Sequence, residues 1–389
     1  MRRVLEGVRI ADLSHVMAGP YATHLLRLLG AEVIKIEPPG RGDAMRFYGA
    51  DRRYDGMAPA FIAVNAGKKS IVLDLKQSRD LENARRLIAR CDVLVENFRP
   101  GVMARLGLDY ATVGGLNPRI VYCSVSGYGQ SGPRRDWPAI DNIVQATSGM
   151  MSLGGDPNGP PMRVGFPAVD TLTGQTAAFA ILAALLERER TGKGDYLDVA
   201  MFDATLAFMA SAVVPYLVTG RALERTGNTG YSGQPTSALF VARDGRHVSL
   251  GVVQQNQFER LAQLLDKPEW LDDERFADPE SRRANAAAMQ ETLSAVLGTR
   301  DAEEWEALLS RAGVPCGMVR DVGEAISLPA LEARSLRIPV QIPGLPERED
   351  VEVLNLGVLS AQDGTDRLEA PPKHGEHTQE ILDWLGESK

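Results

Sequence analysis

Short apolar runs alternate with longer, helix-like stretches over the first 200 residues of the chain. The apolar runs have the length and composition of buried strands: Val8–Leu13, Glu32–Glu37, Val93–Asn97 and Ile120–Val125. Helix-like segments occur between strands at 20–29 and 81–90. Strands that alternate with helices are typical of a parallel sheet covered by helices on both faces. The pattern therefore predicts an α/β fold.

Two strongly apolar segments come next. Ala177–Leu186 is apolar on every side of a helix, which predicts a buried helix. A strand is expected at Tyr196–Met201, and a second buried helix at Phe202–Val218. The apolar stretch from Ala204 to Val218 contains Pro215 and is shorter than the roughly 20 residues that span a bilayer. The first residues contain no apolar stretch of signal-peptide length, so we expect a soluble, cytoplasmic protein.

The composition changes near residue 225. Arg225–Pro235 is polar and rich in glycine, as in a linker or a mobile loop. The pair Asp244-Gly245 then separates two short apolar runs, which predicts a β-hairpin. Three helical stretches and a strand near Gly317–Arg320 follow. The sequence thus predicts a smaller α+β domain at 226–330, with 1–225 and 331–389 forming the large domain.

Charge and cysteine content exclude several classes of protein. The chain has 51 acidic and 43 basic residues and a net charge of -8, which argues against nucleic-acid binding. Its three cysteines, Cys91, Cys123 and Cys316, form no C-x-x-C pair. A disulfide framework or a zinc site built on cysteine is therefore not expected, and a reducing compartment is.

His374 and His377 are the only closely spaced histidines. A metal site would need a third ligand, and no carboxylate cluster or C-x-x-C pair lies nearby in the sequence. The segment Glu376–Thr378 directly precedes a predicted helix, where capping is the simpler role. We expect no metal, and the roles of the two histidines stay open.

Ligands of open parallel sheets bind where the strands end, at their carboxyl edge. The first strand is followed by His15–Pro20, with a proline near the start of the next helix. Free backbone N–H groups at such a turn could hold a phosphate, although a plain strand–helix connection has the same sequence. The turn lacks the G-x-G-x-x-G pattern, which disfavours a nicotinamide-dependent dehydrogenase.

Asp170 is the most informative carboxylate of the chain. It lies in Gly165–Gly174, between a loop rich in proline and glycine and the apolar helix that we expect to begin near Thr171. Asp170 could cap this helix. Alternatively, the helix dipole could keep it ionised as an anionic nucleophile. The residue alone leaves both roles open, and capping is the commoner one.

Several motifs in a fixed order resemble CoA-transferase family III. They cover nearly the whole chain: Leu5–Leu13, His15–Pro20, Gly30–Glu37 with Gly42-Asp43, Asn65 with Lys68–Ser70, Leu73–Lys76, Val95–Gly101, Gly127–Gly129 with Gly132-Pro133, Gly192–Gly194 and Gly375–Thr378. Many motifs in one order are more specific than any single one. The resemblance implies that Asp170 is the catalytic nucleophile, because it matches the aspartate of the family.

The resemblance also implies a fold and a set of substrate contacts. Family members have a large Rossmann-like domain, a small domain, and two protomers interlocked as a homodimer. By resemblance, CoA is held by His15, Val16, Met17, Leu73, Lys76, Asn97, Phe98 and Arg105. The implied partners are an acyl-CoA and a carboxylic acid, and no cofactor is expected to be bound permanently.

Three departures from the family pattern concern the acyl group. Members that handle formate and oxalate carry Gln, Arg and Tyr where this chain has Met17, Pro38 and Ile140. Apolar residues at the first and last of these positions suit an acyl chain longer than formyl or oxalyl. Tyr231–Gly233 replaces a run of glycines, and Gly230, Gly233 and Gln234 keep the character of a glycine loop that could close as a lid.

The α-methylacyl-CoA racemases, a related branch, carry a histidine immediately before the residue that matches Asp141. This chain has Ile140 there, and proton exchange at an α-carbon needs an acid–base pair. We therefore expect transfer of CoA from an acyl-CoA to a free carboxylic acid, preferably a dicarboxylate, through an anhydride and a thioester on Asp170. A racemase-type isomerase and a non-catalytic acyl-CoA-binding protein remain alternatives.

Overall fold

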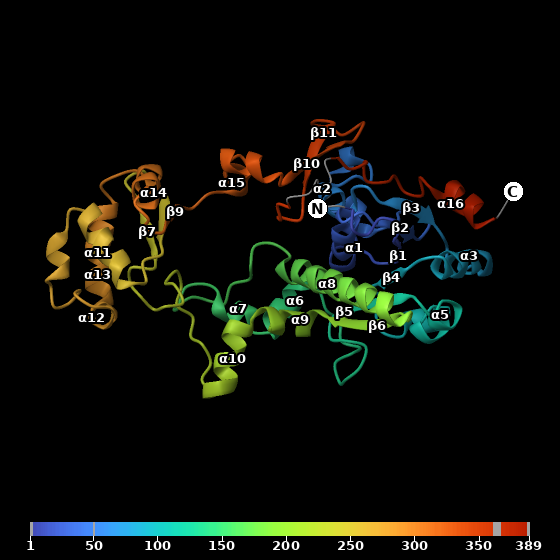
Figure 1. Cartoon of the computed structure of the whole chain (residues 1–389), viewed down its shortest axis with the longest axis horizontal. Helices are drawn as coiled ribbons and strands as arrows, with labels where there is room; N and C mark the ends of the chain where they lie inside the picture. Colours follow the sequence, from blue (N-terminus) through green and yellow to red (C-terminus); the bar gives the residue numbers. More distant parts are fainter. Residues whose placement is uncertain (1–2, 50, 361–366, 387–389) are drawn as a thin grey trace. The chain divides into compact units, whose positions relative to one another are not determined.

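The chain forms two compact units. The computed structural model describes residues 3–49, 51–360 and 367–386 (Figure 1). Unit 1 comprises Met1–Met151, Arg163–Ala222 and Ala330–Lys389. Unit 2 comprises Ser152–Met162 and Leu223–Pro329, so it includes a segment that the sequence analysis placed in the large domain.

Unit 1 is built on a six-stranded sheet in which every pair of neighbours is parallel. Its strands are β1 (Arg9–Asp12), β2 (Glu32–Glu37), β3 (Lys69–Val72), β4 (Val93–Glu96), β5 (Val121–Ser126) and β6 (Asp195–Ala200). The order is β3-β2-β1-β4-β5-β6, as in the Rossmann fold. Strands β2 and β3 are added on one side of β1, and β4 to β6 on the other. A crevice for a ligand is expected where β1 and β4 end, because the strand order reverses between them. The predicted α/β fold is confirmed.

Helices cover both faces of this sheet. The helices of unit 1 are α1 (Ala18–Leu28), α2 (Pro59–Asn65), α3 (Ser78–Ala89), α4 (Val102–Leu106), α5 (Tyr110–Leu116), α6 (Asp141–Thr147), α8 (Ala168–Thr191), α9 (Met201–Phe208), α10 (Ala210–Thr219) and α16 (Thr378–Leu385), while the short α7 (Met150–Leu153) crosses the boundary along the chain. Alternation along β1 sends Ile10 into a core shared with α1 and α8, and Ala11 into a core shared with α3 and α16.

A second, two-stranded antiparallel sheet belongs to the same unit. It pairs β10 (Arg337–Gln341) with β11 (Asp350–Leu354). The buried side chains of Ile338 and Val340 form a small core with Leu28 of α1 and Ile62 of α2. This sheet thus covers the side of α1 and α2 that the parallel sheet leaves free.

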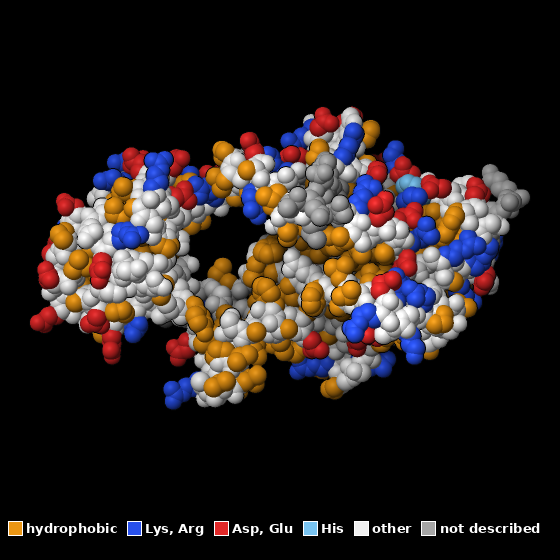
Figure 2. Space-filling model, in the orientation of Figure 1, with side chains coloured by type: hydrophobic (Ala, Val, Ile, Leu, Met, Phe, Trp, Pro, Cys, Tyr) orange, Lys and Arg blue, Asp and Glu red, His pale blue; other side chains and the backbone are white. Residues whose placement is uncertain are grey.

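The prediction that two helices are buried on every side is wrong. Helix α8 exposes Phe179 (74%) and Leu186 (70%), although its other side packs along α1 and the sheet. The segment expected as one buried helix at 202–218 is α9 and α10, bent by 79°, and no residue of α10 is buried. Hydrophobic side chains gather over this region in Figure 2. Apolar composition says how much of a helix could be buried, but not which neighbour covers each side.

Helix α8 has the length and the apolar composition of a membrane-spanning helix. Among the described residues, α8 is the single helix long and apolar enough to cross a membrane, and α9 with α10 would qualify if taken together. Half of the apolar stretch of α8 is buried inside the protein. That burial is typical of a core helix.

Unit 2 combines a three-stranded antiparallel sheet with a helical layer. The strands β7 (Leu239–Val241), β8 (His247–Leu250) and β9 (Cys316–Met318) pair in that order, and Gly245 has a positive φ of 77° in the predicted hairpin, which is confirmed. The helices are α11 (Gln255–Leu264), α12 (Pro279–Ala284), α13 (Ala286–Leu297), α14 (Ala302–Arg311) and α15 (Val322–Ile326). Phe258, Leu293 and Trp305 are central to its own core.

Candidate active site

The turn after β1 is joined directly to the loop after β4. The His15 N–H donates to Asn97 Oδ1 (2.8 Å), and Asn97 Nδ2 donates to the His15 carbonyl oxygen (2.7 Å). The His15 ring meets Phe98 edge-on, with 5.5 Å between ring centroids. Burial and the Lys35 ammonium lower the pKa of His15 below its usual value, so its ring is neutral at pH 7. Three residues predicted to contact CoA are therefore neighbours at one sheet edge.

Val16 and Met17 complete this turn. Val16 has a left-handed backbone (φ 67°) and a side chain that is 43% exposed. Met17 is the residue before α1 and packs against a cluster of Met45, Met57 and Phe61. The helix begins at Ala18, two residues earlier than the sequence predicted, and Met17 makes no side-chain cap. The first turn of α1 therefore lies at the carboxyl edge of the sheet, and the side chain of its N-cap residue does not cap it.

Leu73, Lys76 and Arg105 differ in what they offer. Leu73 follows β3, its N–H donates to the Glu37 carbonyl oxygen (3.0 Å), and its side chain is buried in the core. Lys76 and Arg105 are exposed, and no described residue forms an ion pair with either side chain. Leu73 can thus contact a ligand only through its backbone, whereas the two cations are free to move.

Asp170 lies in the first turn of α8 and does not cap it. Pro167 is the N-cap residue, without a side-chain hydrogen bond. Asp141 Oδ2 instead accepts from the backbone N–H groups of Val169 (2.7 Å) and Asp170 (3.1 Å). The capping interpretation of Asp170 is therefore wrong, because another carboxylate takes that role. No described residue forms a hydrogen bond or ion pair with the Asp170 carboxylate, so this group can react.

The ionisation of Asp170 differs from the sequence-based expectation. Burial, together with the nearby Asp141 charge, raises the pKa of Asp170 to about 7. Burial and Asp141 thus oppose the helix dipole, which the sequence analysis gave as a possible reason for an ionised Asp170. Near pH 7 roughly half of the molecules carry the anion, and this anion is poorly solvated. A poorly solvated carboxylate is a better nucleophile than one in water.

Asp141 is a site residue that the sequence analysis did not assign. Asp141 Oδ1 accepts from Gln145 Nε2 (2.6 Å), and Gln145 Oε1 accepts from the Val164 N–H (2.9 Å). Gln145 is fully buried, so this chain of bonds holds the start of α8 in place. The i, i+4 spacing of Asp141 and Gln145 on one helix face is the signal that could have revealed the pair. Ile140, directly before Asp141, is 65% exposed.

A glycine brings α8, the helix of Asp170, close to α1. A Cβ atom at Gly174 would lie 2.7 Å from the Ala18 carbonyl oxygen and 2.9 Å from the Tyr21 ring. Asp170 is one helical turn before Gly174 and shares its side of α8. The start of α8, which carries Asp170, therefore lies close to the first turn of α1.

A cavity of about 680 Å³ opens beside these elements. Met17 and Thr171, which adjoins Asp170, both line it. Its other walls come mainly from α1, α2 and the β10–β11 sheet: Tyr21, His24, Leu25, Leu28, Tyr54, Pro59, Ile62, Ala63, Val64, Phe166, Leu345, Glu347, Arg348 and Val351–Asn355. Space for an apolar group is thus available next to Met17 and Thr171.

The predicted lid residues belong to unit 2. Gly230 N–H donates to the Ser237 carbonyl oxygen (2.6 Å), and Gly233 has a positive φ of 67°. Gln234 is buried, and its Nε2 donates to the Pro279 carbonyl oxygen (3.1 Å). The loop is therefore fastened to its own unit at Gly230 and Gln234, and Tyr231 between them is 79% exposed.

His374 and His377 attach the C-terminal segment to the sheet. His374 Nε2 lies 2.9 Å from the Pro38 carbonyl oxygen, and His377 Nδ1 accepts from the Ser70 N–H (3.3 Å). Over residues 3–49, 51–360 and 367–386, no group of three or more His, Cys, Asp or Glu side chains is arranged to hold a metal ion. Both histidines thus make structural contacts.

The candidate residues of this Rossmann-like sheet lie at the carboxyl ends of β1 and β4, where α/β enzymes bind their substrates. The model of CoA-transferase family III matches residues 5–378, and the chain belongs to this family. It is 43% identical to an acetyl-CoA:oxalate CoA-transferase of Acetobacter aceti over 88% of each chain. It is 36% identical to a succinate–glutarate CoA-transferase of Agrobacterium fabrum, over 97% of this chain and 94% of that one.

A solved structure has the same fold. The crystal structure of a CAIB/BAIF family protein from Brucella suis superimposes with a TM-score of 0.88 and is 32% identical, covering 99% of this chain and all of the other. The protein is therefore a CoA-transferase enzyme of family III.

Proposed function

We propose that the protein moves CoA from an acyl-CoA thioester to a free carboxylic acid, with Asp170 as the covalent nucleophile. The observation that carries this proposal is the Asp170 carboxylate itself. It is half-buried, has no polar partner among the described residues, and has a pKa raised to about 7 by burial. Carboxylates that hold a fold together are usually hydrogen-bonded to it, and the Asp170 carboxylate accepts no bond from a described residue.

The reaction proceeds by successive exchange at carbonyl carbons. The Asp170 carboxylate attacks the thioester carbonyl, which releases CoA thiolate and leaves an aspartyl–acyl anhydride. The thiolate attacks the aspartyl carbonyl, which frees the first acid and leaves an aspartyl–CoA thioester. The second acid attacks that thioester and forms a new anhydride, and the released thiolate takes the new acyl group. One thioester replaces another, so the net reaction requires no ATP.

The sheet edge is suited to the CoA part of the substrate. In this proposal the turn His15–Met17, the backbone at Leu73, and Asn97-Phe98 contact CoA, while the mobile cations Lys76 and Arg105 meet its phosphates. The cavity beside Met17 and Thr171 receives the acyl group. Water has to be kept away from the anhydride, because it would otherwise hydrolyse it.

The acid substrates are proposed to be small dicarboxylates. The relatives described above are named for oxalate, succinate and glutarate, and another is named for D-citramalate. Oxalate therefore belongs among the acids to test, although Met17 and Ile140 favour a longer acyl group on the donor side. We further propose that the enzyme acts as a homodimer in the cytoplasm, as the sequence resemblance implied.

The deciding experiment is a matrix of acyl-CoA donors against carboxylic acids, with products identified by mass spectrometry. We expect exchange with at least one C4–C6 dicarboxylate in the wild type and none in Asp170→Asn. CoA binding without exchange in any pair would support the non-catalytic alternative. Deuterium from solvent appearing at the α-carbon of an acyl-CoA would support the racemase alternative. Glu187→Gln, on the exposed end of α8, is the matched control and should transfer CoA normally.

A further inference from the structure

Val16 has a backbone conformation that its side chain disfavours. Its φ of 67° lies in the left-handed region, which is strained for β-branched residues. The side chain is 43% exposed, so packing around it cannot be what imposes this conformation. Something must hold the backbone instead, because such strain persists only where the surroundings determine it.

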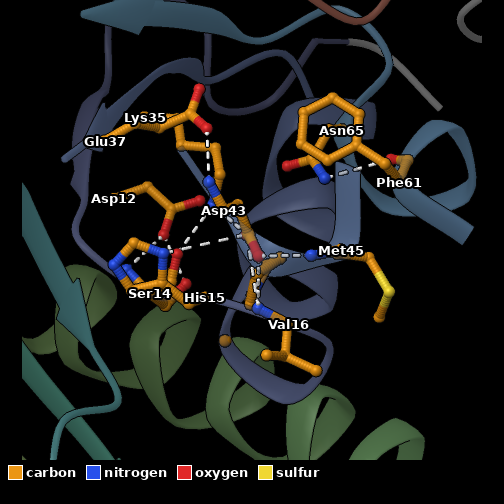
Figure 3. Close-up of polar contacts among 12 residues, drawn as sticks. Asp12, Ser14, His15, Val16, Lys35, Glu37, Asp43, Met45, Phe61 and Asn65 are labelled. Carbon is orange, nitrogen blue, oxygen red and sulfur yellow. Dashed lines mark hydrogen bonds and ion pairs between the residues drawn. The ribbon is translucent and has the colours of Figure 1, made fainter. Parts of the chain in front are cut away.

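A buried ion pair holds this backbone. The Val16 N–H donates to the Asp43 carboxylate, at 3.1 Å from Oδ1 and 3.3 Å from Oδ2. Lys35 Nζ lies 2.8 Å from Asp43 Oδ2 and also donates to the Ser14 carbonyl oxygen (2.7 Å). The side chains of Lys35 and Asp43 are both fully buried. Figure 3 shows the two side chains between β2 and the turn, with their contacts dashed.

Asp43 is itself kept in place by its own neighbours. The Asp43 N–H donates to Glu37 Oε2 (3.0 Å), and Asp43 Oδ1 accepts from the Met45 N–H (3.0 Å). Arg46 contacts both oxygens of Glu37, at 2.8 Å through Nε and 2.6 Å through a terminal nitrogen. The carboxylate that meets Val16 is therefore part of a rigid network (Figure 3).

This network is costly for the fold if stability is its only purpose. Burying a charged pair consumes much of the Coulomb attraction that it gains, and apolar residues of similar volume often serve stability as well. Burial by itself would raise the pKa of Asp43, yet the Lys35 ammonium lowers it below its usual value. Both groups therefore stay charged at neutral pH. Both also contact the turn that contains the strained Val16.

We propose that Lys35 and Asp43 are positioning residues that hold Val16 left-handed, so that the Ser14–Met17 turn is preformed for the CoA thioester. This inference rests on the proposed function, since it assumes that the turn contacts CoA. Without the pair, the turn would relax and would have to be ordered again at each binding event. Ordering costs affinity, so binding suffers more than the chemical step does.

A double-mutant cycle on Val16 and Asp43 tests the proposal. Asp43→Ala should raise the KM for acyl-CoA and the Kd for CoA about tenfold, the size expected from the left-handed preference, with kcat changed less than about threefold. Glycine adopts positive φ without strain. In the Val16→Gly background, the same Asp43→Ala change should therefore cost less than about twofold. Asp43→Asn, which keeps an acceptor for the Val16 N–H, should retain most of the affinity.

Controls separate positioning from stability. Glu32 lies at the other end of β2, the strand that carries Lys35, and it forms an ion pair with Arg9. Glu32→Gln removes this ion pair and should leave the KM for acyl-CoA unchanged. If Asp43→Ala does not fold, Lys35→Met combined with Asp43→Ala leaves no unpaired buried charge, still removes the acceptor of the Val16 N–H, and should show the same loss of CoA affinity.

The result that overturns the proposal is an equal KM effect of Asp43→Ala in the Val16 and Val16→Gly backgrounds, or a fall in kcat with KM unchanged. Either result with an active wild type would leave the proposed function intact. A wild type that neither binds CoA nor exchanges it would instead contradict the proposed function.

Discussion

Asp141 Oδ2 lies 3.1 Å from the backbone nitrogen of Asp170, so one carboxylate holds the peptide that carries the other. The same proximity raises the pKa of Asp170 beyond what burial alone does. Asp141 thus stabilises the start of α8 and also makes the Asp170 side chain harder to ionise. These two effects are separable, because only the second one needs a charge on Asp141.

Replacing Asp170 by asparagine should abolish CoA transfer. An amide has the same shape but cannot form the anhydride, so the loss should reach about three orders of magnitude or more. CoA binding, measured by calorimetry, should remain. Incubation of the wild type with acyl-CoA and then hydroxylamine should modify residue 170, detectable by peptide mass. A fully active Asp170→Asn enzyme would falsify the mechanism.

Replacing Asp141 by asparagine should move the pH dependence of the reaction. With the pKa of Asp170 near 7, kcat/KM of the wild type should rise with pH and level off above about 7. Asparagine keeps an oxygen for the Val169 and Asp170 amides but removes the charge, so the pKa of Asp170 should fall. We expect the midpoint of the profile to move to lower pH, and an unmoved midpoint would contradict this account.

The raised pKa of Asp170 should also be visible in stability. The folded state keeps a proton on Asp170 up to about pH 7, whereas the unfolded chain releases it near its usual pKa of 3.8. The stability that this group contributes is therefore present below about pH 4 and is lost as the pH rises through 7. Urea unfolding of the wild type and Asp170→Asn should show the variant gaining relative stability from pH 5 to 8. A constant difference would mean that the pKa of Asp170 is not raised.

Formyl-CoA should be a poor donor compared with acetyl-CoA or succinyl-CoA. Met17 lines the cavity beside α8, and an apolar wall contributes binding energy only to acyl groups that reach it. Initial rates with each donor and one common acid measure the preference. Met17→Gln should reduce the preference for the longer donors over formyl-CoA. Met45→Leu, in the adjoining cluster, is the control and should leave this preference unchanged. Equal rates for formyl-CoA and succinyl-CoA would mean that Met17 does not contact the acyl group.

The protein should be a homodimer that does not dissociate on dilution. Helices α8, α9 and α10 expose several large apolar side chains, among them Phe179, Phe208 and Val218, and such faces are usually covered in an assembly. Sedimentation velocity over a hundredfold dilution should show one species of dimer mass. A folded monomer that appears on dilution would contradict the interlocked arrangement that the family resemblance implies.

Local patterns predicted most of the parallel sheet. The strand β2 was expected at Glu32–Glu37 and lies there, because an apolar run bounded by turn residues has few other stable conformations. The short edge strand β3 was missed. Its residues Lys69 and Ser70 are polar, and β3 joins the sheet by pairing with β2, which lies far back in the sequence. Pairing with distant residues leaves no local signal.

The candidate site shows the same division. Motif order singled out Asp170 and the residues at the strand ends, because parallel strands bring their carboxyl ends to one edge whatever the details of packing. The sequence could not tell that Asp141 caps α8 or that Asp170 has a raised pKa. Both depend on how far apart two carboxylates lie and on how much water reaches them.

The sequence by itself determined the α/β class, the order of the elements and the family, since these follow from periodicity and from motifs along the chain. Only the tertiary structure decided the left-handed backbone of Val16, the buried pair Lys35–Asp43 that holds it, and the side of each apolar helix that stays exposed. The physical reason is that strain, burial and ionisation are set by neighbours in space. Asp141 and Asp170, which lie 29 positions apart, become neighbours only when the chain has folded.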